Sequence, residues 1–400
     1  MHREGQVSLL VERKTQIIVS LLDGLCQRIE ITENQYQQAK SRYEAVGVWL
    51  SDSISPHLSQ AKIYPQGSIA LGTTMKPLAA NEFDIDLVCH LPSLGASSDA
   101  KAVKALIGAR LQEHGTYKLM LEEKQRCWRV NYANEFHLDI TPSIANNNCA
   151  KGGELVPDKA LAFWKPTNPK GYLNRFEAYA SISPKITTRV MMYSEARAEV
   201  APIPEQTMSK PILKRIVQLL KRHRDHKYFA KPNAKLAPIS VIITTLAAWA
   251  YAKCASQQAH QDEFDFITSV IRAMPSFIRI EERNGMHLFV IENETTVGEN
   301  FADKWNSDPR LASEFYDWHC DALSSIDSLL QLEGVDQFTE SLSNSFGARK
   351  VVIKEIFEKL VTPIGQARSA GLLSIAPSVG LIATHSYGAI TVPKNTFFGL

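Results

Sequence analysis

Residues 65–87 read PQGSIALGTTMKPLAANEFDIDL, and this is the most informative stretch of the chain. It joins a Gly67-Ser68 pair to two acids, Asp84 and Asp86, that stand two residues apart in an apolar run. Side chains on a strand alternate between its two faces. Asp84 and Asp86 are therefore predicted to share one face, with the apolar residues around them on the other.

A second apolar alternation, residues 136–140, carries a third acid, Asp139. If the two strands pair, three carboxylates converge, and like charges so close repel unless cations neutralise them. Hard oxygen ligands suit Mg²⁺ or Mn²⁺. Two such ions roughly 3.5–4 Å apart activate an attacking hydroxyl and stabilise a leaving phosphate. The three acids therefore predict metal-dependent nucleotidyl transfer.

The Gly67-Ser68 pair adds a second part to this prediction. Glycine lets the backbone approach a phosphate closely, and Ser68 adds a hydroxyl and an N–H as donors. An Asp-x-Asp motif alone is typical of any solvated strand end, and Gly-Ser alone is typical of turns. The combination in one stretch is more specific than either motif.

The combination resembles the polymerase-β-like nucleotidyltransferases, and more closely the bacterial CD-NTases. These are relatives of cyclic GMP–AMP synthase that make cyclic oligonucleotide signals in antiphage defence (CBASS). The motifs that carry the resemblance follow in order: PQGS at 65–68, GTTMKP at 72–77, EFDIDL at 82–87, FHLDITP at 136–142, LLKRHRD at 219–225 and ENFADKW at 299–305. They extend over most of the chain.

The resemblance implies an α+β, two-lobed polymerase-β-like nucleotidyltransferase fold with a helical C-terminal lobe. We expect a catalytic lobe with a long N-terminal helix over 1–205, a helical lobe over 206–370 and an extended tail over 371–400. Apolar spacing predicts helices and strands within these parts, and a long loop over 142–172 beside the site. The predicted helices are 7–30, 34–57, 99–114, 208–228, 237–257, 262–273, 299–305, 308–333 and 348–369; the strands are the Asp84 strand and an antiparallel pair at 126–132 and 135–141.

A basic helix is predicted over 208–228. Nine Lys or Arg residues lie between Lys210 and Lys235 against one acid, Asp225. Most of these charges, with His223 and His226, are expected on a solvated face. In cyclic GMP–AMP synthase a helix Lys and a Ser about twenty residues later grip the donor phosphates. Lys221 and Ser240 match that arrangement, but Val241 stands where the animal enzyme has a base-stacking aromatic.

The resemblance assigns a role to each candidate residue. Asp84, Asp86 and Asp139 would be catalytic and would bind Mg²⁺ or Mn²⁺. Gln66, Gly67, Ser68, Lys221 and Ser240 would bind the nucleotide. The substrates would be NTPs, ATP among them, and the product an adenine-containing cyclic di- or trinucleotide made in antiphage signalling. Arg126 and Arg129 flank the Asp139 hairpin and either face an acceptor nucleotide or lie on the surface.

Composition limits the alternatives. A net charge of +2 on 400 residues predicts no strong nucleic-acid-binding surface. The six cysteines lack the spacing of a zinc site, and no apolar run approaches the length of a membrane span. We therefore expect a cytoplasmic protein without a membrane partner. Two alternative functions remain open: a template-independent RNA or tRNA nucleotidyltransferase, and a catalytically silent nucleotide-binding scaffold.

The last residues, 384–400, contain β-branched side chains and one charge, Lys394. This pattern predicts an extended segment. In one type of CBASS the resembling enzymes are joined through their C-terminus to other molecules by an E1/E2-like ligase. Gly399 fits a narrow ligase channel because it lacks a Cβ, whereas Leu400 departs from the small terminal residue of those enzymes.

Overall fold

The computed structural model describes residues 2–78, 82–133, 135–158, 160–187, 210–283 and 285–369, and three short strands beyond them. The chain divides into two compact units. One comprises residues 26–327; the other comprises residues 1–25 and 328–400. Helix α1 (His2–Ile29) begins in the second unit and ends in the first. No helix of the described residues is both long and apolar enough to cross a membrane.

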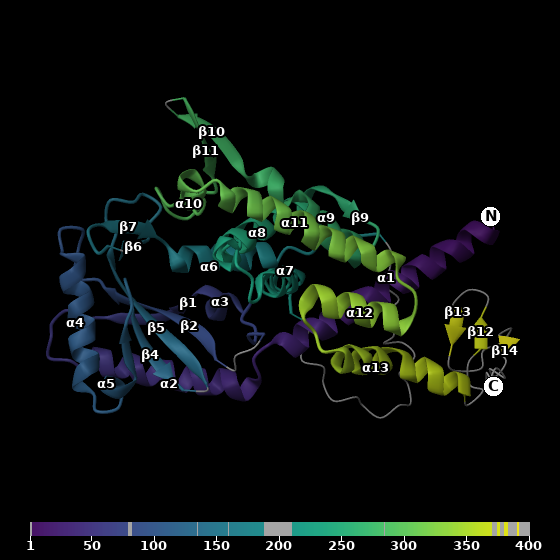
Figure 1. Cartoon of the computed structure of the whole chain (residues 1–400), viewed down its shortest axis with the longest axis horizontal. Helices are drawn as coiled ribbons and strands as arrows, with labels where there is room; N and C mark the ends of the chain where they lie inside the picture. Colours follow the sequence, from purple (N-terminus) through teal and green to yellow (C-terminus); the bar gives the residue numbers. More distant parts are fainter. Residues whose placement is uncertain are drawn as a thin grey trace. The chain divides into compact units, whose positions relative to one another are not determined.

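A seven-stranded sheet is the centre of the larger unit (Figure 1). Its main path runs β1-β2-β5-β4-β3, in which β2 and β5 are parallel and the other neighbours are antiparallel. A β6–β7 hairpin extends it from β5. The strands are β1 (Lys62–Gln66), β2 (Phe83–Leu91), β3 (Leu121–Glu123), β4 (Trp128–Tyr132), β5 (Phe136–Ala145), β6 (Glu154–Pro157) and β7 (Trp164–Thr167).

Two helices cover one face of this sheet. Residues of α2 (Glu33–Ser51) and α4 (Ala100–Glu113) form one hydrophobic core with the odd-numbered residues of β2 and the even-numbered residues of β4 and β5. Thr32 caps α2 through a reciprocal capping box with Gln35, and Asp99 caps α4. Burial of one face fixes the strand register, because a one-residue slip would turn every apolar side chain outward.

The segment 142–172 is not the long loop that the sequence predicts. It contains the end of β5, the β6–β7 hairpin and the start of α6 (Pro169–Ala180). The two hairpin strands have four residues each and include prolines, so their alternation is too short to recognise. Asn168 caps α6 by accepting a hydrogen bond from the Gly171 N–H at 2.9 Å, and Pro169 follows at the first helical position.

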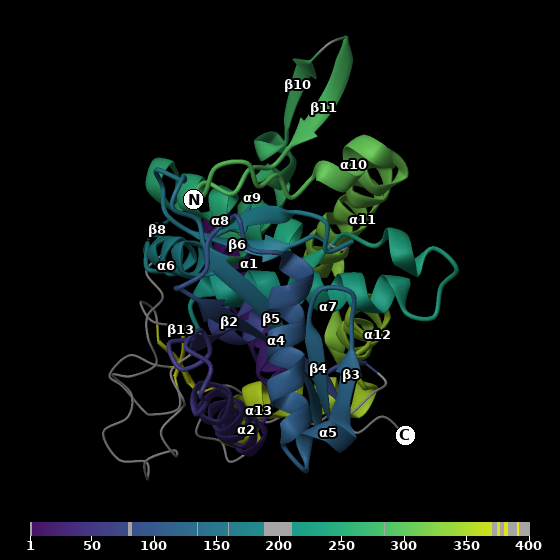
Figure 2. The ribbon, with the colours of Figure 1, turned by 90° about the vertical axis from the view of Figure 1, so that its left-hand side faces the viewer.

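Helices make up most of the rest of the larger unit. They are α7 (Ile212–Tyr228), α8 (Ser240–Gln257), α9 (Glu263–Ala273), α10 (Asp303–Ser307) and α11 (Arg310–Asp327). The predicted helix at 208–228 begins at Ile212, after Pro211, and the one predicted at 299–305 begins at Asp303. An unpredicted hairpin, β10 (Arg279–Arg283) with β11 (Met286–Val290), projects from this part (Figure 2).

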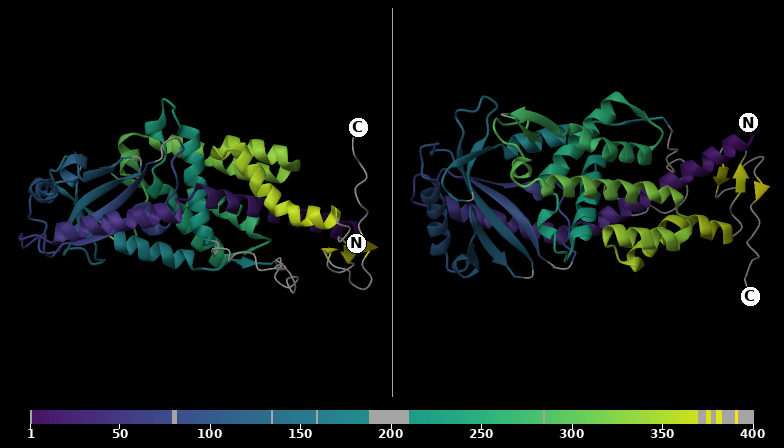
Figure 3. Two further views of the ribbon diagram at one scale, coloured as in Figure 1. Left: turned by 90° about the horizontal axis from the view of Figure 1, so that it is seen from below. Right: turned by 45° about the horizontal axis from the view of Figure 1, so that its top comes forward.

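The smaller unit contains the first part of α1 with α12 (Gly334–Phe346) and α13 (Lys350–Ser369), which lie side by side (Figure 3). Gly24 of α1 packs tightly on α13: an added Cβ would lie 2.6 Å from Ile356 Cγ2. Of the tail expected over 371–400, the structure describes three strands in the order β13-β12-β14 (Gly380–Ile382, Ser374–Ala376, Ile390–Thr391). Gly399 and Leu400 lie outside the described residues.

Candidate active site

Two parallel strands bring the three predicted carboxylates to one face of the sheet. The register of β2 and β5 places Asp86 beside Asp139 and Asp84 beside His137. The intervening Ile85 is fully buried in the core, so the acids face the opposite side. The two strands that carry the acids are therefore paired, which is the condition on which the predicted convergence of the three carboxylates depends.

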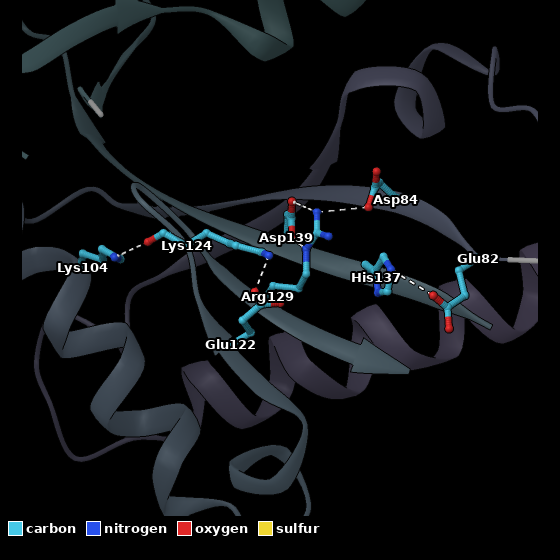
Figure 4. Close-up of polar contacts among 8 residues, drawn as sticks. All are labelled: Glu82, Asp84, Lys104, Glu122, Lys124, Arg129, His137 and Asp139. Atoms are coloured by element: carbon cyan, nitrogen blue, oxygen red, sulfur yellow. Dashed lines mark hydrogen bonds and ion pairs between the residues drawn. The ribbon is translucent and has the colours of Figure 1, made fainter. Parts of the chain in front are cut away.

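Arg129 of β4 lies against this acidic face (Figure 4). It stands opposite Asp139 in the antiparallel β4–β5 pair. Its Nε lies 2.6 Å from Asp139 Oδ1 and its Nη2 lies 2.8 Å from Oδ2, which is the two-pronged geometry of strong guanidinium–carboxylate pairs. Nη2 also lies 3.1 Å from Asp84 Oδ1. The structure therefore places Arg129 at the acids, and its contact with an acceptor nucleotide stays a prediction.

Asp86 is the most deeply placed of the three acids. Burial raises the pKa of its carboxyl to about 6, and the negative charges of Asp139 and Asp84 add to the effect. The positive charges of Arg129 and Lys221 oppose it. The raised pKa therefore reflects mainly a carboxyl withdrawn from water, and repulsion by the neighbouring acids comes second.

The Gly67-Ser68 turn packs directly against Asp86. Gly67 has φ +62°, and an added Cβ would lie 2.8 Å from Asp86 Oδ2, so only glycine fits both the conformation and the space. Gln66 stands opposite Asp86 in the β1–β2 pair. Gly67 begins the short helix α3 (Gly67–Leu71), and Ser68 Oγ accepts a hydrogen bond from Thr74 Oγ1 at 3.3 Å. The structure therefore brings Gln66, Gly67 and Ser68 to the acids.

The basic helix α7 differs from the prediction. Much of its polar surface is buried: Gln218 is fully buried, and Arg222, His223 and Lys221 are 6%, 3% and 6% exposed. Arg222 and His223 were expected on a solvated face because their charge favours water, whereas Lys221 was expected to point into the cleft. Gln218, Lys221 and Arg222 are buried by the segment after Ser68, whose backbone carbonyl groups they meet. His223 instead lies against Ser325 of α11.

Four donors from in and just before α7 bind consecutive parts of this segment. Lys210 Nζ lies 3.2 Å from Gly72 O, and Lys221 Nζ lies 3.0 Å from Thr73 O. The other two contacts join Gln218 Nε2 to Thr74 O at 3.4 Å and Arg222 Nη2 to Lys76 O at 3.0 Å. We call these four residues the α7 clamp. It holds the connection between the Gly67-Ser68 turn and the Asp84 strand.

Lys221 lies close enough to Asp86 for their charges to interact. Burial lowers the pKa of its ammonium group to about 8, and the nearby Arg224 charge acts in the same direction. Ser240, the first residue of α8, reaches this cluster through Arg224, whose Nη1 and Nη2 each lie 3.2 Å from Ser240 Oγ. Lys221 and Ser240 are thus on neighbouring elements, connected by an arginine that the sequence reasoning missed. Its signal was available, since Arg224 lies one helical turn after Lys221.

The three acids supply the hard oxygen donors that Mg²⁺ and Mn²⁺ prefer. Within the described part of the chain, no three His, Cys, Asp or Glu side chains lie close enough to hold one ion as they stand. Arg129 lies between two of the acids. The two neighbouring carboxylates, whose charges add to the effect of burial on the pKa of Asp86, nevertheless fit a site that accepts further cations.

Comparison with known proteins agrees with this geometry. Residues 17–179 match the family model of the Second Messenger Oligonucleotide or Dinucleotide Synthetase domain. The c-di-GMP synthase of Roseivirga ehrenbergii is 30% identical over 393 residues, which cover 96% of this chain and 98% of that protein. The chain belongs to the bacterial CD-NTase family.

Two further comparisons involve one relative. The cyclic dinucleotide synthase CdnG of Bradyrhizobium diazoefficiens is 26% identical over 410 residues, with 95% of this chain and 94% of that protein covered. The solved structure of that CD-NTase in complex with GTP matches with a TM-score of 0.63 at 22% identity, covering 86% of this chain and 99% of the other. This likeness confirms the predicted α+β polymerase-β-like fold with a helical C-terminal part.

Proposed function

We propose that this CD-NTase makes a cyclic dinucleotide from guanine nucleotides. The observation that carries the proposal is the row Gln66–Asp86–Asp139 across β1, β2 and β5, with the Gly67-Ser68 turn packed on Asp86. Such a row places a phosphate-binding turn beside a set of carboxylates. The match to a c-di-GMP synthase over 96% of the chain supports the choice of product.

The proposed reaction is attack of a ribose hydroxyl on the α-phosphorus of an NTP. A new phosphodiester bond forms, the bond to the β-phosphate oxygen breaks, and pyrophosphate leaves. The N–H and hydroxyl of Ser68 would bind the leaving phosphates. Lys221 of α7 and Ser240 of α8 would bind the same triphosphate. A second attack, by the free hydroxyl of the linear product on its own triphosphate, would close the ring.

Asp84, Asp86 and Asp139 would hold the Mg²⁺ or Mn²⁺ ions. When bound, these ions would lower the pKa of the attacking hydroxyl and neutralise charge on the leaving group. The carboxylates would fix where the ions lie, and Asp139, which stands between Asp86 and Arg129 across the strands, would orient the attacking hydroxyl.

Guanine departs from the adenine-containing product that the sequence led us to expect. The relatives that match over nearly the whole chain carry the names c-di-GMP synthase and CdnG, and the matching solved structure holds GTP. We therefore propose GTP as the main substrate, with ATP as the comparison.

The test is incubation of the full chain with GTP alone, ATP alone or both, with Mg²⁺. We expect a mass and chromatographic retention of c-di-GMP from GTP alone, resistant to phosphatase. A product of mixed bases would contradict the guanine assignment. Extension of an added RNA would favour the template-independent nucleotidyltransferase, and nucleotide binding without any product would favour the silent scaffold. Asp86→Asn serves as the inactive control.

We further propose an antiphage signalling role, with an E1/E2-like ligase acting on the C-terminal tail. The support is the resemblance to CBASS enzymes and the uncharged sequence around Gly399, which itself lacks a side chain. Deletion of residues 395–400 would leave synthesis in vitro unchanged while abolishing linkage to cellular proteins and protection from phage. Loss of synthesis together with a lower melting temperature would instead assign the tail a structural role.

A further inference from the structure

The row Gln66–Asp86–Asp139 across β1, β2 and β5 continues into β4 and β3. Arg129 of β4 stands opposite Asp139, and Glu122 of β3 stands opposite Arg129. The sheet therefore carries Asp86, Asp139, Arg129 and Glu122 in one line across four strands. Directly opposed residues on neighbouring antiparallel strands have Cβ atoms about 4.5–5.5 Å apart. Arg129 thus has a carboxylate on each side.

In the structure Arg129 uses only one of these neighbours for its close contacts. Its guanidinium binds both oxygens of Asp139 and one oxygen of Asp84. Glu122 pairs instead with Lys124, their charged groups 2.5 Å apart, although the charge of Arg129 still contributes to the lowered pKa of Glu122 (Figure 4). The guanidinium therefore occupies the same oxygens that a divalent ion would coordinate.

We propose that Arg129 is an internal counter-cation that holds Asp84 and Asp139 in the metal-free enzyme and transfers to Glu122 when divalent ions enter. This inference rests on the proposed function, since it takes Asp84 and Asp139 as metal ligands. It makes Arg129 a positioning residue for the reaction: the side chain keeps repelling acids together until the ions replace it.

The surroundings of Arg129 fit a side chain that turns on a fixed backbone. The neighbouring Trp128 is buried and donates from Nε1 to Lys104 O at 2.8 Å, and Val130 is fully buried in the core. These contacts anchor β4 on the covered face of the sheet. The guanidinium lies on the open face, where the side chains of Asp84 and Glu122 are both largely in solvent. A rotation about the Arg129 side chain bonds moves it from one acid to the other without breaking the sheet.

The proposal predicts competition between Arg129 and metal, which can be measured without catalysis. The experiment titrates Mn²⁺ into the nucleotide-free full chain and follows free Mn²⁺ by electron paramagnetic resonance. Arg129→Gln should bind Mn²⁺ about tenfold more tightly than the parent, because no charge-assisted pair has to be broken. Arg126→Gln removes the same charge from the neighbouring loop and should change the affinity by no more than about twofold.

A second pair of variants tests the acceptor. Glu122→Gln removes the partner to which Arg129 would transfer and should weaken Mn²⁺ binding about threefold. Glu123→Gln has the same change of charge, but its side chain points to the other face of β3 and should have no such effect. Mn²⁺ should also raise the melting temperature of Arg129→Gln by more than it raises that of the parent, since in the variant only the ion holds the acids together.

Equal Mn²⁺ affinity in Arg129→Gln and in the parent, or equal gains in Arg129→Gln and Arg126→Gln, would overturn the proposal. If Arg129→Gln does not fold, Arg129→Lys replaces it; an ammonium group lacks the planar fork that pairs with both oxygens of Asp139 in parallel, so the affinity should lie above that of the parent. The proposed function fails separately: the parent would then make no cyclic product from GTP, whatever its Mn²⁺ affinity.

Discussion

Two regions of the larger unit bring charged side chains together, and they balance the charges in different ways. On the β2–β5 face three carboxylates lie together, balanced in part by the guanidinium of Arg129. On α7 the buried side chains of Lys221, Arg222 and Gln218 meet backbone carbonyl groups of the segment 73–76. In the first region the carboxylates are held by the positive charge of Arg129, which another cation can replace. In the second region the side chains of α7 are held by carbonyl dipoles that are fixed in the backbone.

This difference indicates separate tasks for the two regions. An arrangement of exchangeable ion pairs suits a site that must accept ions and release them. An arrangement of side chains on carbonyl groups suits a part that must keep one loop in place, because no soluble ion replaces a hydrogen bond from a buried donor. The α7 clamp would then position the Gly67-Ser68 turn, while the acids do the chemistry.

The strongest test of this comparison is Asp86→Asn. We expect a loss of synthesis of roughly a thousandfold or more, because one ligand of the proposed ions disappears with several kcal/mol of charge stabilisation. The same change should not destabilise the fold. The carboxyl of Asp86 has a folded-state pKa near 6, above its ordinary value of 3.8, so its ionised form is disfavoured by folding.

The sign of this effect sets its pH dependence. Because the ionised carboxyl of Asp86 is disfavoured in the folded protein, the free energy of unfolding of the parent decreases as the pH rises through about 6. At pH 8 the Asp86→Asn variant should therefore be more stable than the parent, by up to about 3 kcal/mol. At pH 4 the difference should nearly vanish. Urea unfolding at the two pH values measures it. A variant that unfolds more easily at pH 8 and keeps its activity would contradict both halves of the assignment.

The second test concerns Lys221, which belongs to both regions. Lys221→Met should raise the apparent KM for the nucleotide about tenfold or more, as loss of a charge-assisted phosphate contact predicts. Because burial lowers the pKa of Lys221 to about 8, the charged form decreases above that pH. The parent should therefore bind nucleotide less well as the pH rises from 7 to 9. Lys221→Arg, whose charge does not titrate in this range, is the control and should lose the pH dependence. A parent whose KM is constant across this range would exclude Lys221 from the phosphate site.

The residues that the sequence could predict are those with a local pattern. Asp84, Asp86 and Asp139 lie in period-two runs, and Gly67 precedes them at a turn, so alternation and one motif were enough to place them on one face. The burial of Arg222 and His223 could not be predicted in this way. Their partners lie more than 100 residues away in either direction: Lys76 for Arg222, and Ser325 for His223. The sequence of α7 shows which of its side chains can donate hydrogen bonds, but it does not show which distant groups accept them.

The third test separates position from stability in the α7 clamp. Gln218 is fully buried, its Nε2 makes a long 3.4 Å contact with Thr74 O, and its Oε1 has no hydrogen-bond partner among the described residues. Gln218→Met removes this half-satisfied amide and fills the same volume. We expect the free energy of unfolding to change by less than about 1 kcal/mol, whereas turnover should decrease about tenfold as the turn loses its position. Urea unfolding and initial rates measure the two. A variant that is strongly destabilised but fully active would show that Gln218 serves the fold alone.

The smallest effect should come from Ser240, the first residue of α8. Its Oγ meets both terminal nitrogens of Arg224, which also binds Pro238 O at 2.7 Å and Asp225 Oδ1 at 2.7 Å. Arg224 therefore keeps two partners when Ser240→Ala removes the hydroxyl, and the arrangement around Lys221 should survive. If Ser240 touches the triphosphate, the variant loses one hydrogen bond from an uncharged hydroxyl, and the KM for GTP should rise about tenfold or less, with turnover unchanged, because the ion pair made by Lys221 remains. Ser256, near the C-terminal end of the same helix, provides the matched control in Ser256→Ala. A KM that is the same in both serine variants would limit Ser240 to holding Arg224, and the triphosphate grip would then rest on Ser68 and Lys221.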